Sequence, residues 1–176
     1  MKNVKTVAGI KDPYTKRILS NILNKDAFNV YCQTPSRLKH LVKGLSEKQL
    51  RTPRSKTGWS ISQIVNHLCD AESVFAYRVR LILSQSGTPI QAYDEKAWAK
   101  NLHYEKSNCR EKLELFTQLR NDHIKTLRSL SPSEWQRFGM HAERGKETVE
   151  RLVQMHAGHD VNHRKQVEEI RKSFKG

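Results

Sequence analysis

Four long stretches of this chain repeat apolar residues every three or four positions, which is the spacing of one face of an α-helix. A start is marked most clearly in the second stretch, where Ser60 and Gln63 have the spacing of a capping box. No stretch alternates with the period of two that a half-buried strand requires. The chain of 176 residues is therefore expected to form an all-α domain, a four-helix bundle. The expected helices cover residues 27–45, 61–83, 105–130 and 146–173.

The segments outside these helices are shorter and less regular. Residues 1–24 are expected to form an N-terminal arm with at most a short helix, and residues 25–176 the bundle domain. Pro35 must either start a helix or kink one, because proline lacks the N–H of a helix interior. Residues 85–104 and 139–145 are expected to be loops.

Charge and hydropathy narrow the class of protein. No apolar run approaches the roughly 18 residues of a membrane span, and the N-terminus lacks the apolar core of a signal peptide, so we expect a cytoplasmic protein without a membrane partner. The three cysteines are widely spaced, which predicts reduced thiols. The formal net charge of +14 suits a polyanion, but the cations are spread out and no nucleic-acid-binding motif accompanies them. A solvated basic face is therefore expected rather than a nucleic-acid site.

The last helix carries histidines where core residues belong. His156, His159 and His163 lie within about 60° of one another on the apolar face of that helix. Charged imidazoles would repel each other there, whereas neutral imidazoles at positions i and i+4 can share a metal ion. His159 and His163 are therefore predicted metal ligands, with structural hydrogen bonding as the alternative. Gly158 lies in mid-helix, where it either admits a close backbone or serves packing.

A third ligand must come from another helix, and His67, at the edge of the second apolar stripe, is the candidate. Three neutral imidazoles suit zinc, nickel, iron or copper better than calcium or magnesium, and they leave coordination positions open, as catalytic sites do. His141 either lines the mouth of the site or is exposed. Nearby carboxylates either orient an imidazole or are solvated helix charges. These are Asp70, Glu72 and Asp160, while the histidines less suited to be ligands are His40, His103 and His123.

The chain resembles the DinB/YfiT-like superfamily in three stretches. They are GWSISQIVNHLCDAE at 58–72, TPIQAYDEKAWA at 88–99, and residues 141–170, whose HDxxHxxQ core spans 159–166. The resemblance implies an up-down-down-up four-helix bundle, often dimeric, that holds nickel or zinc. It assigns the ligand positions to His67, His159 and His163.

Members of that superfamily with assigned activity are mainly thiol-dependent S-transferases, and others were described as metal-dependent hydrolases. The resemblance therefore implies an enzyme that binds a divalent metal, a low-molecular-weight thiol and a small-molecule substrate. Tyr93, Asp94 and Trp98 are expected to line the cofactor entrance, or else to cap the end of the bundle. A hydrolase and a non-enzymatic basic module that binds metal or nucleic acid stay open as alternatives, and no catalytic residue is assigned.

Overall fold

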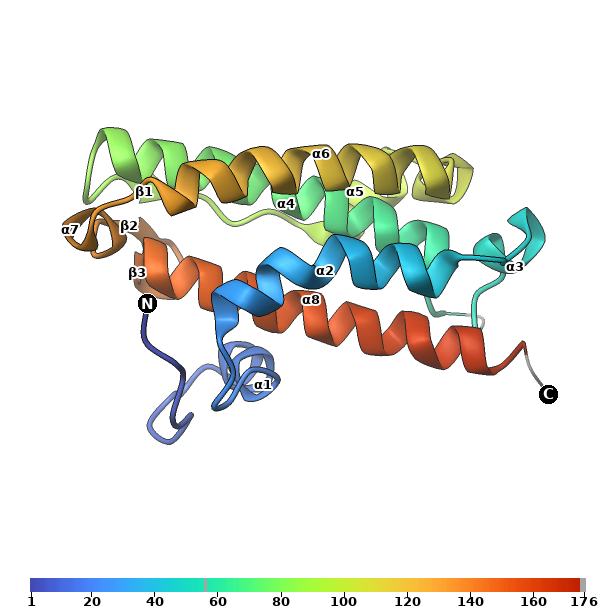
Figure 1. Cartoon of the computed structure of the whole chain (residues 1–176), viewed down its shortest axis with the longest axis horizontal. Coiled ribbons are helices and arrows are strands. Elements are labelled where there is room, and N and C mark those ends of the chain that lie inside the picture. The colour runs from blue at the N-terminus through green and yellow to red at the C-terminus, as the bar shows by residue number, and fades with distance from the viewer. Residues whose placement is uncertain (56, 175–176) are drawn as a thin grey trace.

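The computed structural model describes residues 1–55 and 57–174, and four long helices dominate this part of the chain. α2 and α6 lie beside each other, as do α4 and α8, and the pairs α2–α8 and α4–α6 complete the bundle (Figure 1). The all-α four-helix prediction is confirmed. The bounds are α2 (Ala27–Val42), α4 (Ile61–Ser84), α6 (Cys109–Arg128) and α8 (Val149–Lys172). Two short helices, α3 (Glu47–Arg51) and α7 (Pro132–Trp135), lie in the connections.

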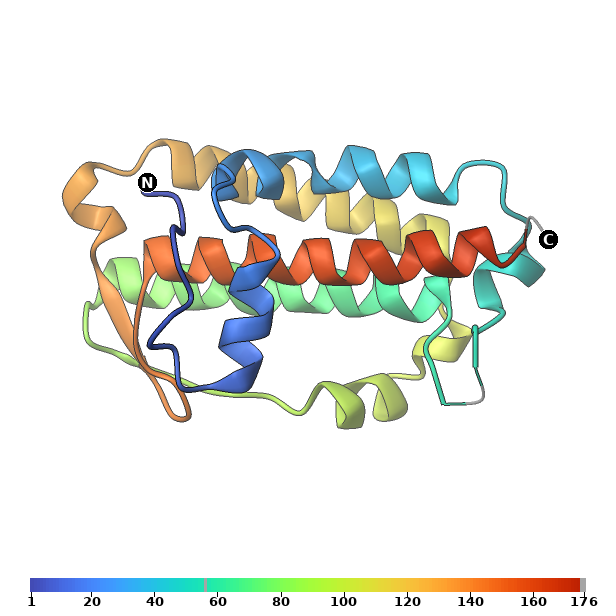
Figure 2. The same cartoon turned by 90° about the horizontal axis from the view of Figure 1, so that it is seen from below.

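The direction of the helices explains the long connection in the middle of the chain. α2 and α8 run one way along the bundle and α4 and α6 run the other way, so the order is up-down-down-up (Figure 2). Because α4 and α6 are parallel neighbours, the chain must return along the bundle between them. This return contains β1 (Pro89–Ile90), α5 (Glu95–Asn101) and a 3-10 turn, Tyr104–Lys106. The expected loop at 85–104 therefore carries helical turns, and α6 starts only at Cys109.

A small sheet, which the sequence pattern did not predict, closes one end of the bundle. β2 (Phe138–His141) pairs antiparallel with β3 (Gly145–Thr148), and β1 pairs parallel with β2. The expectation of a simple loop at 139–145 is wrong, because strands of two to four residues are too short to establish an alternating pattern. Pairing of residues 145–148 also delays the start of α8 to Val149.

The N-terminal residues pack on the bundle through α1 (Pro13–Ser20), which crosses α8. A Cβ atom on Gly158 would lie 2.3 Å from the carbonyl oxygen of Ile18, so the glycine is required by a close backbone approach. The Nδ2 group of Asn21 also donates to the Gly158 carbonyl over 3.2 Å. Gly158 thus allows two helices to touch backbone to backbone.

Pro35 lies inside α2, so the alternative that it starts a helix is wrong. A proline in a helix interior leaves the carbonyl four residues earlier without its usual N–H donor. That carbonyl belongs to Tyr31, and the Nη1 group of Arg120 donates to it over 2.7 Å. An arginine on α6 therefore replaces the missing helix bond of α2.

Within the described residues, none of the helices combines the length and apolar character that crossing a membrane would need.

Candidate metal centre

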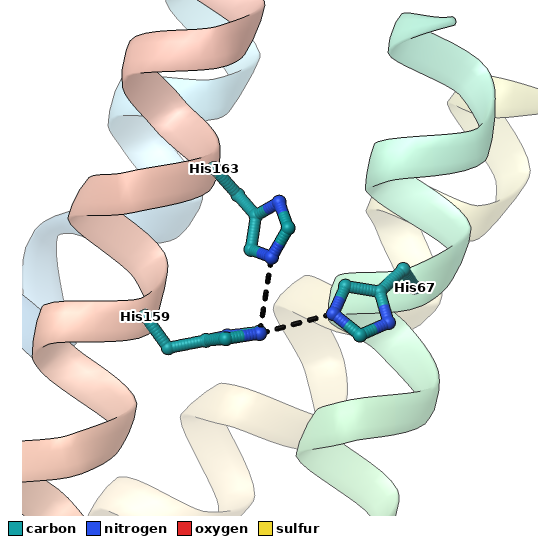
Figure 3. Close-up of side chains that lie close together, drawn as sticks. All are labelled: His67, His159 and His163. Carbon is teal, nitrogen blue, oxygen red and sulfur yellow. Dashed lines mark hydrogen bonds between the residues drawn. The ribbon is translucent and has the colours of Figure 1, made fainter. Parts of the chain in front are cut away.

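Three histidines from two helices converge in the middle of the bundle. His67 comes from α4, and His159 and His163 come from successive turns of α8 (Figure 3). The Nε2 atom of His159 lies 3.0 Å from that of His67 and 3.1 Å from that of His163. Two imidazole nitrogens that bind one ion at about 2.1 Å are about 3.0–3.4 Å apart. One potential ligand atom from each of the three residues lies within 4.8 Å of the other two, so the predicted residues are brought together as a metal site requires.

The surroundings keep these imidazoles neutral. Burial, together with the neighbouring His163, lowers the pKa of His67 to about 3, and burial lowers the pKa of His163 to about 4. The pKa of His159 lies well below its ordinary value, again first because of burial and then because of the other histidines. A metal binds the unprotonated imidazole, so burial prepares the ligands. The donor set therefore fits a divalent ion of the zinc or nickel type.

Gln166 fixes the orientation of one ligand. Its Oε1 atom accepts from Nδ1 of His163 over 2.8 Å, which leaves the Nε2 lone pair of His163 facing the other two rings. Among the described residues, the Nδ1 atoms of His67 and His159 are buried without a hydrogen-bond partner. The glutamine lies in the HDxxHxxQ stretch, three residues after the histidine that it orients.

Two further side chains stand beside the ligands, and sequence reasoning did not select either of them. The Oε2 atom of Glu95, at the start of α5, lies 3.8 Å from Nε2 of His67. The Trp59 ring lies 5.1 Å from the His67 ring and stacks over His163 at 6.4 Å and 17°. Glu95 directly follows Asp94 in the second stretch of resemblance, and that position was the available signal.

Two cavities reach the candidate ligands. One has a volume of about 290 Å³ and reaches His159, and the other has about 600 Å³ and reaches His163. Glu95 lines both of them. The first cavity also contains His141, Arg78 and Tyr93, whereas the second contains Trp59, Lys96 and Gln166. Ligands can therefore approach the histidines from two sides.

The expected entrance residues have different positions. Tyr93 lines the smaller cavity, and its ring packs against that of Trp98 with 4.6 Å between the centroids. The carboxylate of Asp94 accepts from the backbone N–H groups of Lys96 and Ala97, so it caps α5. Trp98 contacts Tyr93 but lines neither of the two cavities.

The other histidines are also placed by the structure. His141 is buried in β2 and lines the smaller cavity, so the interpretation of it as an exposed loop residue is wrong. His156 lines the same cavity and stacks on Phe75 with 4.0 Å between ring centroids. His40 and His103 are exposed, and His123 is buried away from the three candidate ligands.

The neighbouring carboxylates belong to a buried ionic cluster. Arg120 is fully buried, and its guanidinium binds Glu72 at 2.9 Å and Asp160 at 2.7 Å. Tyr31 donates to Glu72 over 2.5 Å, and the Nδ1 atom of His123 lies 3.1 Å from the same carboxylate. Both sequence readings of Glu72 and Asp160 are wrong, since they neither orient a candidate ligand nor face solvent.

Asp70 has a separate partner. Its Oδ2 atom accepts from the hydroxyl of Tyr104 over 2.6 Å, which ties α4 to the 3-10 turn of the return connection. It too makes no bond to a candidate ligand.

Comparison with known proteins gives one family. Residues 31–167 match the model of the DinB superfamily. A "Putative metal-dependent hydrolase" of Oceanobacillus iheyensis is 30% identical over 149 residues, which are 82% of this chain and 84% of that protein. The "Putative metal-dependent hydrolase YfiT" of Bacillus subtilis is 29% identical over 140 residues, 78% of each chain. The solved structure of YfiT, described as an unusual four-helix bundle, matches with a TM-score of 0.80 at 23% identity and covers 99% of this chain and 94% of its own.

Proposed function

This chain belongs to the DinB superfamily, and from that membership we propose that it is a metal-dependent enzyme that transfers a low-molecular-weight thiol to a small electrophilic substrate. His67, His159 and His163 hold one divalent ion, zinc or nickel, in this proposal. The observation that carries it is the convergence of three neutral, buried imidazoles, two of which line separate cavities. Such an ion, when bound, supplies a Lewis acid that lowers the pKa of a coordinated thiol or water.

The protein's own residues provide binding and orientation. Gln166 holds the ring of His163, and Trp59 covers two of the ligands with an apolar surface that excludes water. Glu95 presents a carboxylate where the two cavities meet, within reach of the proton that a thiol gives up. Tyr93 forms part of the wall against which a bound molecule packs.

Two cavities favour a reaction with two substrates. A thiol can occupy one side of the histidines and an electrophile the other, so the sulfur forms its new bond to carbon while the leaving group departs with its electron pair. A hydrolase is the second candidate, and the names of the relatives from Oceanobacillus iheyensis and Bacillus subtilis favour it. In that case water replaces the thiol at the same position.

Metal analysis tests the site itself. After reconstitution with zinc or nickel and dialysis, the wild-type protein should retain about one equivalent of metal. The change His67→Ala removes one of three ligands and should reduce retention to less than about a tenth. The control is His40→Ala, which alters an exposed imidazole on α2 and should bind like wild type. Equal retention in all three proteins would contradict the proposal.

The products distinguish transfer from hydrolysis. The metal-loaded protein is given an aryl halide as electrophile, with and without a low-molecular-weight thiol, and products are identified by mass spectrometry. The proposal predicts a thioether that forms only when the thiol is present. A phenol product, with release of the halide, formed equally well without thiol would instead establish the hydrolase.

We extend the proposal to the assembly, for which the family resemblance is the support. A homodimer is expected, and light scattering of the purified protein measures its mass.

A further inference from the structure

Arg78, on α4, is a buried cation. The residue is 8% exposed and lines the smaller cavity, where its guanidinium donates to the backbone carbonyl of Gln91. Among the residues that the structure describes, no carboxylate oxygen lies within 4.0 Å of its guanidinium. Burying a guanidinium without an opposite charge is costly, and natural proteins almost always pair such a group. The positive charge of Arg78 is therefore available to bind an anionic ligand.

The surroundings of Arg78 add donors and a flat wall. Arg144 lines the same cavity, but it is already paired with Glu147 at 3.3 Å. The Nδ1 atom of His141 accepts from the backbone N–H of Glu143, so its Nε2 atom carries the proton. That Nε2 donor is buried and has no hydrogen-bond partner in the described part of the chain. The ring of Tyr93 lies 5.9 Å from the guanidinium of Arg78.

The cavity leads from Arg78 to the candidate metal centre. His67 and Arg78 share one face of α4, and Ala71 and Val74 lie between them on the same cavity wall. Arg78 follows His67 by eleven positions, about 16 Å further along the helix axis. The other end of this cavity is open to the candidate ligands, because His159 lines it together with Arg78. A ligand that touches both must be elongated and charged at its far end.

We propose that Arg78 binds a carboxylate at the end of the substrate or cosubstrate that reaches the metal centre. The planar fork of a guanidinium matches a carboxylate in two parallel hydrogen bonds. Three acidic residues, Asp12, Glu95 and Glu143, also line the cavity, and they disfavour a doubly charged phosphate. The ligand class is thus a monoanionic carboxylic acid whose reactive group lies several bonds from its carboxylate.

This inference rests on the proposed function, and thiols of matched length test it. Nickel-loaded protein is titrated with 6-mercaptohexanoate and with the neutral 6-mercaptohexanol, and thiolate binding is followed by its charge-transfer absorption. Wild-type protein should bind the acid roughly 10–100-fold more tightly, as expected for hydrogen bonds to a charged group. The change Arg78→Met should abolish this preference and leave the affinity for the alcohol unchanged.

The matched control is Arg80→Met on the same helix. Arg80 is exposed, and its guanidinium pairs with Asp122 at 3.3 Å on the outside of the bundle. This variant should keep the wild-type preference for the acid. The proposal is overturned if Arg78→Met still prefers the acid, or if wild-type protein binds both thiols equally.

A second measurement separates this proposal from thiol transfer. If neither thiol binds the nickel-loaded protein, the thiol chemistry fails, and the carboxylate site is judged on metal-free protein by thermal unfolding. Hexanoate should raise the melting temperature of wild type and Arg80→Met but not of Arg78→Met. Without any anion, Arg78→Met should melt at the same temperature as wild type or higher, since an unpaired buried charge is removed. Stronger stabilisation by hexyl phosphate than by hexanoate, or equal stabilisation of all three proteins by hexanoate, would refute the carboxylate assignment.

Discussion

Arg120 shows how much of this bundle depends on one side chain. It bonds to Glu72 and Asp160 and also completes α2 at the carbonyl of Tyr31 that Pro35 leaves free. Its guanidinium also lies 3.6 Å from the centroid of the Tyr31 ring. All of these contacts are buried, so each lost bond leaves a polar group without water as a substitute.

The change Arg120→Met should therefore be severe. Two buried carboxylates lose their counter-charge, and such a loss typically costs about 3–5 kcal/mol. Urea unfolding followed by circular dichroism measures this directly. The control Arg80→Met removes an exposed ion pair with Asp122 and should cost no more than about 1 kcal/mol. Similar midpoints for the two variants would show that the cluster does not hold the bundle together.

For single residues, the sequence indicates which face of a helix a side chain occupies better than it indicates which side chains that residue contacts. Arg120 lies four residues after Phe116 and seven after Leu113, so it occupies the apolar stripe of α6, and this placement is visible in the sequence. Its partners Glu72 and Asp160 lie on two other helices, and only the packing of the bundle brings them together. The same holds for Glu95, which reaches His67 from a separate short helix. His159 and His163 were predictable because their spacing lies within one helix.

Among the elements, α1 shows how a helix can depend on its neighbour, here α8. It packs on α8 at the point where Gly158 has no side chain, and the carbonyl of Ile18 fills that space. Helix propensity alone would favour alanine over glycine in mid-helix by about 1 kcal/mol. The glycine is therefore explained by the contact and not by the helix.

The change Gly158→Ala should destabilise the protein despite its better propensity. The added methyl group meets a backbone atom that cannot rotate away, so α1 must shift, at a net cost of about 1–3 kcal/mol. Urea unfolding gives the cost, and trypsin cleavage at Lys16 or Arg17 should become faster because α1 is released. Ala76→Gly on α4, away from α1, calibrates the propensity effect alone. A Gly158→Ala protein that is more stable and equally resistant to trypsin would contradict the close-contact explanation.

The elements that the sequence predicted are those with enough residues to show a period. α4 and α8 have 24 residues each, and their apolar stripes fix both their existence and their buried faces. β2 and β3 have four residues each and form through pairing with each other and with β1, which no local pattern reveals. Strand pairing moved the start of α8 from the expected residue 146 to Val149.

For the molecule as a whole, buried histidines make stability depend on pH. Burial, the largest cause for both groups, lowers the pKa of His156 to about 3 and that of His141 to about 4, from an unfolded value of 6.5. The unfolded chain therefore takes up these protons first as the pH falls. The stabilising contribution of both groups is complete above pH 6.5 and is lost as the pH falls toward their folded values.

Metal-free protein should accordingly melt at lower temperatures as the pH falls from about 6.5 to about 4. Glu72 adds a further loss of stability below pH 4.5. Burial raises the pKa of its carboxyl group, but Arg120 and then His123 outweigh burial and lower the pKa to about 2. Differential scanning calorimetry at several pH values measures the slope. His156→Leu, beside the ring of Phe75, should flatten the curve above pH 4, and an unchanged slope would exclude His156 as a cause.

The pairing of α4 with α8 has a further consequence for the lifetime of the folded molecule. His67 and His159 are 92 positions apart, and the three cysteines are free, so no disulfide joins these regions. An ion held by both histidines would act as a reversible crosslink between these positions. A permanent crosslink over a loop of this length lowers the entropy of the unfolded chain by an amount equivalent to about 4–5 kcal/mol. Because the crosslink forms only after both helices have docked, metal supply would set how long the folded molecule persists.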